Sequence, residues 1–186
     1  MAVKIQRGEM NMGILSFLFP PDPPTQEAPW KLIKDSYISC EGIPSSYTVI
    51  DLETSGLDPR HSEILEIGAI KYRDGTETGR YHTFVRPVGR IPSSASSVNG
   101  PTWRKLHSEP LLDDVQDAFF SFIGDDVLVG HNIGFDITFV QTRFGVNLEN
   151  KCFDTLKWSR LAFPNLQSYK LDSLRTYFTL GGEAHS

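Results

Sequence analysis

The order of apolar segments between residues 47 and 178 constrains the fold of this chain more than any other feature of the sequence. Residues 47–53, 63–72 and 81–86 are rich in β-branched and aromatic residues, and the run RDGTETGR supplies turn residues between the last two. Further along, apolar residues recur at helical spacing around two short apolar runs, DVLVGH and KCFDT. We therefore predict a three-stranded antiparallel meander, followed by strands that alternate with helices.

The expected helices are located by their apolar spacing. The first helical face consists of Leu111, Leu112, Val115, Ala118, Phe119 and Phe122, and Gly124 ends that helix. The second is marked by Phe135, Phe139, Val140 and Phe144. Two more helices are expected over residues 154–162 and 171–178. Together the segments predict an α/β fold, with a five-stranded mixed sheet flanked by helices on both faces.

Length and charge limit the classes to which the protein can belong. A chain of 186 residues suits one domain with a full core. Its formal net charge of −5 provides no general basic surface for unspecific nucleic-acid binding, so a polyanion would have to be held locally. No apolar run is long enough to cross a bilayer, and two cysteines cannot form a disulfide framework. A reducing cytoplasm is the expected compartment.

The first 46 residues differ from the rest. The apolar run of residues 12–19 is followed by a proline-rich segment that cannot continue a helix. A signal peptide is the alternative, but Glu9 interrupts the pattern and no small-residue cleavage site follows. We expect residues 1–46 to be a partly extended arm, and residues 47–186 to be the folded domain.

Two carboxylates, Asp51 and Glu53, follow Val49 and Ile50 in the first expected strand. Side chains two residues apart on a strand point to the same face, so both acids share one side of the sheet. An uncompensated buried charge costs about 3–5 kcal/mol. The pair therefore indicates a bound cation or, on a solvated face, surface ion pairs, and the apolar neighbours favour burial.

A third carboxylate, Asp136, lies in the first turn of the helix expected after the run VGHNIG. Polar residues at a helix start commonly cap free backbone N–H groups, which is the structural alternative for His131, Asn132 and Asp136. If the preceding strand adjoins that of Asp51, then Asp136 meets Asp51 and Glu53 at one point. Three such oxygen ligands suit Mg²⁺ or Mn²⁺, and the cation would offset their repulsion.

These segments carry a family resemblance. The run DLETSG, from Asp51 to Gly56, resembles the first motif of the DnaQ-like 3′→5′ exonucleases, the DEDD family, and HNIGFD, from His131 to Asp136, resembles the second. The runs EILEIGAI and VNGPTWRKLHSEPLLDDV are similar to connecting segments of the epsilon proofreading subunits of bacterial DNA polymerase III. No Tyr-x3-Asp follows the second motif, which favours the histidine branch. The resemblance implies an RNase H-like fold.

The resemblance also implies a two-metal hydrolysis that releases nucleoside monophosphates from DNA 3′ ends. Asp51, Glu53 and Asp136 would bind two divalent ions, Mg²⁺ or Mn²⁺, and His185 would act as the catalytic base. The expected substrate-binding residues are Thr54, Ser55, Gly56, Leu57, His131, Asn132 and Phe135. The expected partners are a single-stranded or frayed 3′ end, DNA in preference to RNA, and a DNA polymerase.

The third motif of the family, His-x4-Asp after a leucine-rich helix, is matched only in part. YKLDSLRTYF corresponds to the helix and His185 to the histidine, but Ser186 is the last residue of the sequence. We therefore expect this chain to lack the fourth carboxylate and its helix, and to be weakly active or inactive. Two alternatives stay open: an RNA-trimming exonuclease of the same family, and a binding module for 3′ ends or partner proteins. For His185 itself, the alternative is an unstructured tail.

Overall fold

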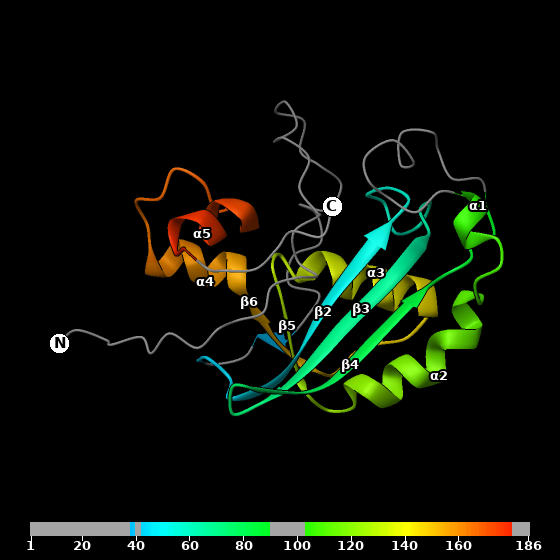
Figure 1. Ribbon diagram of the computed structural model, residues 1–186, viewed down its shortest axis with the longest axis horizontal. Coiled ribbons are helices and arrows are strands. Elements are labelled where there is room, and N and C mark those ends of the chain that lie inside the picture. Colours follow the sequence, from blue (N-terminus) through cyan, green and yellow to red (C-terminus); the bar gives the residue numbers. More distant parts are fainter. Residues whose placement is uncertain (1–37, 40–41, 90–102, 180–186) are drawn as a thin grey trace.

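The computed structural model describes residues 38–39, 42–89 and 103–179, which form one mixed sheet with helices on both faces (Figure 1). The strands are β1 (Ile38–Ser39), β2 (Ser46–Thr54), β3 (Ile64–Arg73), β4 (Thr76–Phe84), β5 (Val127–Gly130) and β6 (Lys151–Asp154). The helices are α1 (Trp103–Leu106), α2 (Leu112–Ile123), α3 (Gly134–Phe144), α4 (Thr155–Ala162) and α5 (Leu171–Tyr177).

The sheet has the strand order β1-β6-β5-β2-β3-β4. The pairs β2–β3 and β3–β4 are antiparallel, whereas β1–β6, β6–β5 and β5–β2 are parallel. The five predicted strands and the mixed sheet are confirmed. The two-residue β1 adds a sixth strand within the described residues, and it comes from the segment expected to be an arm.

The hairpin between β3 and β4 is tighter than the sequence suggested. Its turn consists of Asp74 and Gly75, with φ of 49° and 76°, and two-residue hairpin loops favour such positive values. β4 therefore begins at Thr76, not at residue 81 as expected. Its first half is exposed and polar, because an edge strand can pair through its backbone without apolar side chains.

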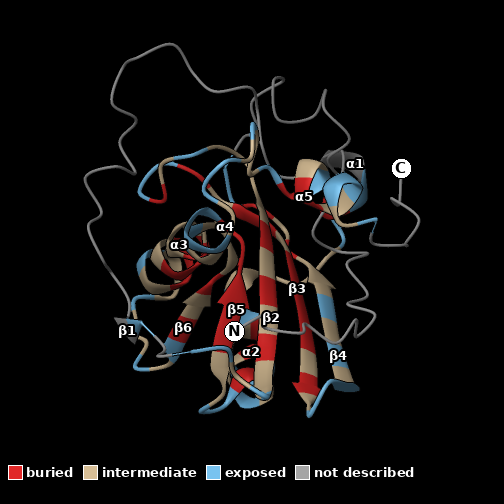
Figure 2. Ribbon diagram, turned by 90° about the vertical axis from the view of Figure 1, so that its left-hand side faces the viewer, coloured by how far each residue is buried: buried red, intermediate tan, exposed pale blue. Residues whose placement is uncertain are grey.

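Successive side chains of β2 point alternately to the two faces of the sheet. Ile50 and Leu52 are buried against the core, which α2 and α3 complete. In Figure 2 the buried residues, in red, follow β5, β2 and β3 through the centre of the molecule. Asp51 and Glu53 alternate with these core residues and therefore lie on the other face.

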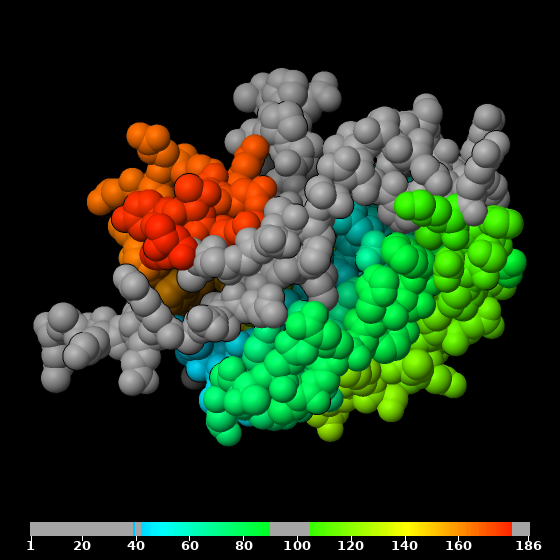
Figure 3. Space-filling model, in the orientation of Figure 1, coloured from blue at the N-terminus to red at the C-terminus, as the bar shows by residue number. Residues whose placement is uncertain are grey.

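Helix α4 covers part of this second face. Trp158 of α4 packs against Phe153 of β6, with ring centroids 6.4 Å apart. Phe153 is in register with Val129 of β5, and Val129 with Val49 of β2, so all three side chains share the face of Asp51. Figure 3 shows α4 and α5, orange to red, on one flank of the molecule, and β3, β4 and α2, in green, on the other.

The predicted helices are confirmed, and α1 is an additional short helix that the sequence pattern did not indicate. Gly124 ends α2, and Gly145, with a φ of 66°, ends α3 in the left-handed conformation that suits glycine. None of the helices in the described ranges has the length and apolar content of a membrane span.

Candidate active site

The paired carboxylates lie near the carboxyl end of β2. Asp51 and Glu53 are half-buried, and antiparallel pairing with β3 places Asp51 opposite Gly68 and Glu53 opposite Glu66. Residues paired across two strands point to the same face of the sheet, so Glu53 and Glu66 stand side by side. The acidic group on this face is therefore larger than the two residues that the sequence motif indicated.

Asp136 reaches the same place from the first turn of α3. β5 pairs with β2 only as far as Val49, so the backbone N–H of Leu52 lies beyond this pairing. Asp136, which is 5% exposed, accepts a hydrogen bond from that N–H at 3.1 Å through its Oδ1. Its carboxylate thus contacts β2 at the residue between Asp51 and Glu53.

Burial and mutual repulsion disfavour ionisation of all three acids. The pKa of Asp51 is raised well above its usual value, first by burial and then by the charges of Asp136, Glu53 and Glu66. Burial, followed by repulsion from Glu66, raises the pKa of Glu53 to about 7. Burial also raises the pKa of Asp136. In the described part of the chain, no Lys, Arg or His forms an ion pair with these carboxylates.

The donor set fits a hard divalent cation. Asp51, Glu53 and Asp136 offer only carboxylate oxygens, and two positive charges would offset the repulsion that raises their pKa values. As the side chains stand, no three His, Cys, Asp or Glu residues among those described are arranged to hold a metal ion. The fit therefore rests on the chemistry and charge of the donors.

The loop after β2 is held by its own side chains. The hydroxyl of Thr54 donates to the carbonyl of Gly56 at 2.7 Å, and Ser55 Oγ accepts from the N–H of Glu63 at 2.8 Å. A Cβ at Gly56 would lie 2.6 Å from the Oγ of Ser62, so a larger residue there would require the Ser62 side chain to shift. Leu57 is 45% exposed beside this loop.

His131, expected to bind substrate, is turned into the protein and is 8% exposed. Its Nε2 lies 2.8 Å from the carbonyl oxygen of Tyr169, just before α5, and its Nδ1 lies 3.0 Å from Thr155 Oγ1 at the start of α4. Burial lowers the pKa of its imidazole. A neutral ring would donate from Nε2 and accept at Nδ1, so His131 joins β5 to both helices.

The other residues of the second motif have separate positions. Asn132 has a φ of 66°, and its N–H donates to Asp154 Oδ1 at 3.0 Å. Phe135 packs on Phe139, with ring centroids 4.8 Å apart. His185 lies outside the described residues.

Glu66 and His82 are members of the site that the motifs did not reveal. His82 Nε2 lies 2.6 Å from Glu66 Oε1, which places a histidine of β4 next to the acidic group. Both residues stood in segments recognised as strands. Their relation to Glu53 depends on strand register, for which the sequence offered no direct signal.

Comparison with known proteins agrees with this arrangement. The sheet order and the flanking helices define an RNase H-like α/β protein, with carboxylates at the end of its central strand. A family model described as "Exonuclease" (RNase T) matches residues 48–186, and the chain belongs to this exonuclease family. The family is one of nucleases, which generally use divalent metal ions.

Two relatives represent the sequence matches. The chain is 32% identical over 148 residues to the PolC-type DNA polymerase III of Clostridium perfringens. The matched region covers 78% of this chain and 10% of that protein. The chain is 33% identical over 141 residues to the DNA polymerase III subunit epsilon of Aquifex aeolicus, covering 73% and 69% of the two chains. The chain thus spans about a tenth of the length of the PolC-type relatives.

Solved structures show the same fold. Exonuclease X, in complex with 5′ overhanging duplex DNA, has a TM-score of 0.58 and 25% identity, and the match covers 73% of this chain and 74% of that one. E. coli exonuclease I, in complex with a dT13 oligonucleotide, has a TM-score of 0.66 and 18% identity, and the match covers 77% of this chain and 38% of that one. The latter likeness shows the fold alone.

Proposed function

We propose that this domain is a metal-dependent 3′→5′ exonuclease that removes nucleoside monophosphates from single-stranded or frayed DNA 3′ ends. The observation that carries the proposal is the meeting of Asp51, Glu53 and Asp136 at the end of β2, without a compensating cation among the described residues. Membership of the exonuclease family supports the reaction class. The DNA in the complex of exonuclease X supports the substrate.

Each residue then has a role in the reaction. Asp51, Glu53 and Asp136 would hold two divalent ions, Mg²⁺ or Mn²⁺, and these would supply positive charge next to the attacking and leaving oxygens of a phosphodiester. His185 takes the proton of the attacking water. The loop of residues 54–57 receives the terminal nucleotide, with close backbone approach at Gly56 and the exposed Leu57 against the base.

The residues of the second motif that precede Asp136 act mainly by holding neighbouring segments in place. His131 contributes by holding the starts of α4 and α5, because both of its ring nitrogens already contact protein atoms. Asn132 holds the turn that leads into α3, and Phe135 packs on Phe139 within α3. Proofreading beside a DNA polymerase is the context that the names of the relatives support, and binding of a polymerase subunit in gel filtration would test it.

The function is tested with a single-stranded DNA oligomer labelled at its 5′ end. With Mn²⁺ we expect a slowly developing ladder that shortens from the 3′ end, in line with the weak activity expected from the sequence, and no ladder with EDTA. Asp51→Asn should lower turnover by several orders of magnitude, whereas Asp126→Asn, at the other end of the sheet, should not. Degradation that is equal in wild type and Asp51→Asn would overturn the proposal.

A matched RNA oligomer completes the experiment. Slower hydrolysis of RNA than of DNA is expected. Faster hydrolysis of RNA would contradict the DNA assignment and favour the RNA-trimming alternative. Binding of the 3′ end without any metal-dependent cleavage would instead favour the non-catalytic module.

A further inference from the structure

Glu66 occupies a defined place beside the paired carboxylates. It lies directly across from Glu53, and cross-strand neighbours of this kind have Cβ atoms about 4.5–5.5 Å apart. Glu66 is half-buried and therefore faces the same partly enclosed space as the two motif acids.

Gly68 leaves room in the middle of this group. It pairs with Asp51 of β2 on one side and with His82 of β4 on the other. Glu66, two residues earlier on β3, points to the same face. Because Gly68 has no side chain, no side chain from β3 stands between Asp51 and His82.

His82 holds Glu66 from the far side. Its Nε2 lies 2.6 Å from Glu66 Oε1, and its ring stands edge-on to Phe84, with centroids 5.0 Å apart and an interplanar angle of 83°. Two contacts thus orient the imidazole, and one oxygen of Glu66 is engaged by it. Among the described residues, Glu66 Oε2 has no hydrogen-bond or ion-pair partner.

We propose that Glu66 is a fourth carboxylate of the cation site, acting beside Glu53, and that His82 is its positioning residue. The inference rests on the proposed function, since it assigns Glu66 to the same metal-dependent site. It concerns a strand of the central sheet and is independent of the third family motif. In this arrangement β2 and β3 both contribute ligands to one ion, and β4 fixes the orientation of the β3 ligand.

The test measures binding of Mn²⁺ alone to the full chain by titration calorimetry, without nucleic acid. Glu66→Gln keeps the size of the side chain and an oxygen that can accept from His82, so the fold should be retained, which thermal unfolding in EDTA checks. We expect its Mn²⁺ affinity to fall about tenfold or more. His82→Gln should cause a smaller loss, and Glu66→Asp should retain more affinity than Glu66→Gln.

Glu77→Gln is the matched control, because it also removes one negative charge from the hairpin but does so at a carboxylate paired with Arg80. Its Mn²⁺ affinity should equal that of the wild type. If Glu66→Gln binds Mn²⁺ as the control does, or more tightly, Glu66 only repels its neighbours and the inference is wrong. If Asp51→Asn also binds Mn²⁺ like the wild type, the proposed metal site itself fails.

Discussion

At the scale of single residues, the site concentrates negative charge where the fold disfavours it. Asp51, Glu53 and Asp136 all have raised pKa values, and burial is the largest cause for each. The folded protein without a cation therefore binds protons at these groups more tightly than the unfolded chain does. Stability and the proposed metal binding are consequently linked through the same three side chains.

The pH dependence of stability follows from this link. The pKa of Glu53 is about 7 in the folded protein, above its usual 4.5. The stability that protonated Glu53 contributes is therefore fully present below pH 4.5 and is lost as the pH rises through about 7. In EDTA we expect the melting temperature to fall between pH 5.5 and pH 7.5. Glu53→Gln should show a smaller fall, measured by thermal unfolding.

Glu77→Gln serves as the control for this comparison. The hydrogen bond from Arg80 lowers the pKa of Glu77, so its replacement should not reduce the fall in melting temperature. An identical fall in the wild type and in Glu53→Gln would contradict the assignment of the pH effect to Glu53.

A second prediction concerns the loop after β2. Gly56→Ala brings a Cβ to 2.6 Å from Ser62 Oγ and should displace the loop that we propose receives the terminal nucleotide. We expect a higher KM for a single-stranded oligomer. Ser62→Ala in the same chain should restore KM, because the next contact, with Ser62 Cβ, is an ordinary 3.6 Å. Failure of Ser62→Ala to rescue would show that the clash is not the cause.

At the scale of elements, the second motif joins the sheet to the α4–α5 layer. Asp154 ends β6 and caps α4 by accepting from Leu156 N and Lys157 N, and it also accepts from the N–H of Asn132. His131 adds the contacts to Thr155 and to the carbonyl of Tyr169. The helix pair is therefore attached where the second motif leaves β5.

His131→Ala tests this attachment. It removes the partner of the Tyr169 carbonyl and should cost about 1–3 kcal/mol of unfolding free energy. Hydrogen exchange should accelerate mainly in α5, with β2 and β3 less affected. His61→Ala, at an exposed loop histidine, is the control and should leave exchange unchanged. Equal acceleration throughout the sheet would contradict a local role for His131.

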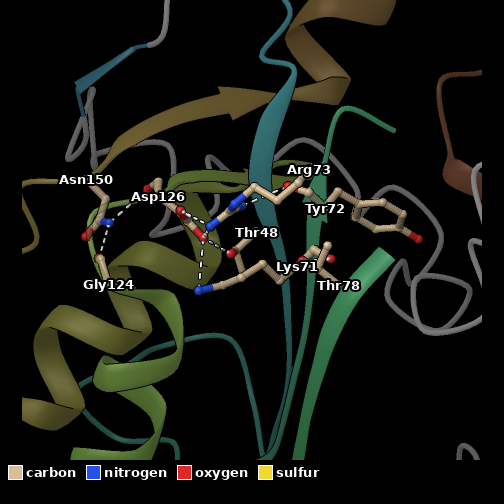
Figure 4. Close-up of polar contacts among 8 residues, drawn as sticks. All are labelled: Thr48, Lys71, Tyr72, Arg73, Thr78, Gly124, Asp126 and Asn150. Carbon is tan, nitrogen blue, oxygen red and sulfur yellow. Dashed lines mark hydrogen bonds and ion pairs between the residues drawn. The ribbon is translucent and has the colours of Figure 1, made fainter. Parts of the chain in front are cut away.

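At the scale of the whole molecule, the sheet carries its stabilising polar contacts and its acidic site at opposite ends. Figure 4 shows Asp126, just before β5, beside Thr48, Arg73 and Lys71. Its carboxylate accepts from Thr48 at 2.6 Å and from Arg73 at 2.6 and 2.9 Å, and it lies 3.3 Å from Lys71 Nζ. Asn150 donates to the backbone carbonyls of Gly124 and Asp126. These contacts join β2, β3, β5 and the end of α2 away from the carboxylates.

This separation predicts that stability and catalysis can be changed independently. Asp126→Asn should lower the unfolding free energy by about 1–2 kcal/mol, a value reduced for the partial exposure of Arg73. Its kcat and KM should remain those of the wild type. Denaturant unfolding and the oligomer assay measure the two effects, and a loss of kcat at unchanged stability would contradict the separation.

Sequence patterns alone placed most of the secondary structure of the domain. β-Branched and aromatic residues bounded by turn residues predicted β2 and β3, and helical spacing predicted α2 and α3, because helical spacing reflects which face of a helix is buried. The same reasoning set Asp51 and Glu53 on one face and Asp136 in the first turn of α3. Where side chains are exposed, as in the first half of β4, burial leaves no pattern to read.

Relations between distant segments were decided only by the tertiary structure. The pairing of Glu53 with Glu66 and the contact of Glu66 with His82 depend on strand register, which backbone pairing across whole strands determines. The inward orientation of the His131 side chain depends on its contact with the carbonyl of Tyr169, 38 residues further along the chain. The sequence by itself thus determined which acids share a strand face, because that relation is local. Only packing decided which side chains surround them, because such contacts form when distant segments are brought together.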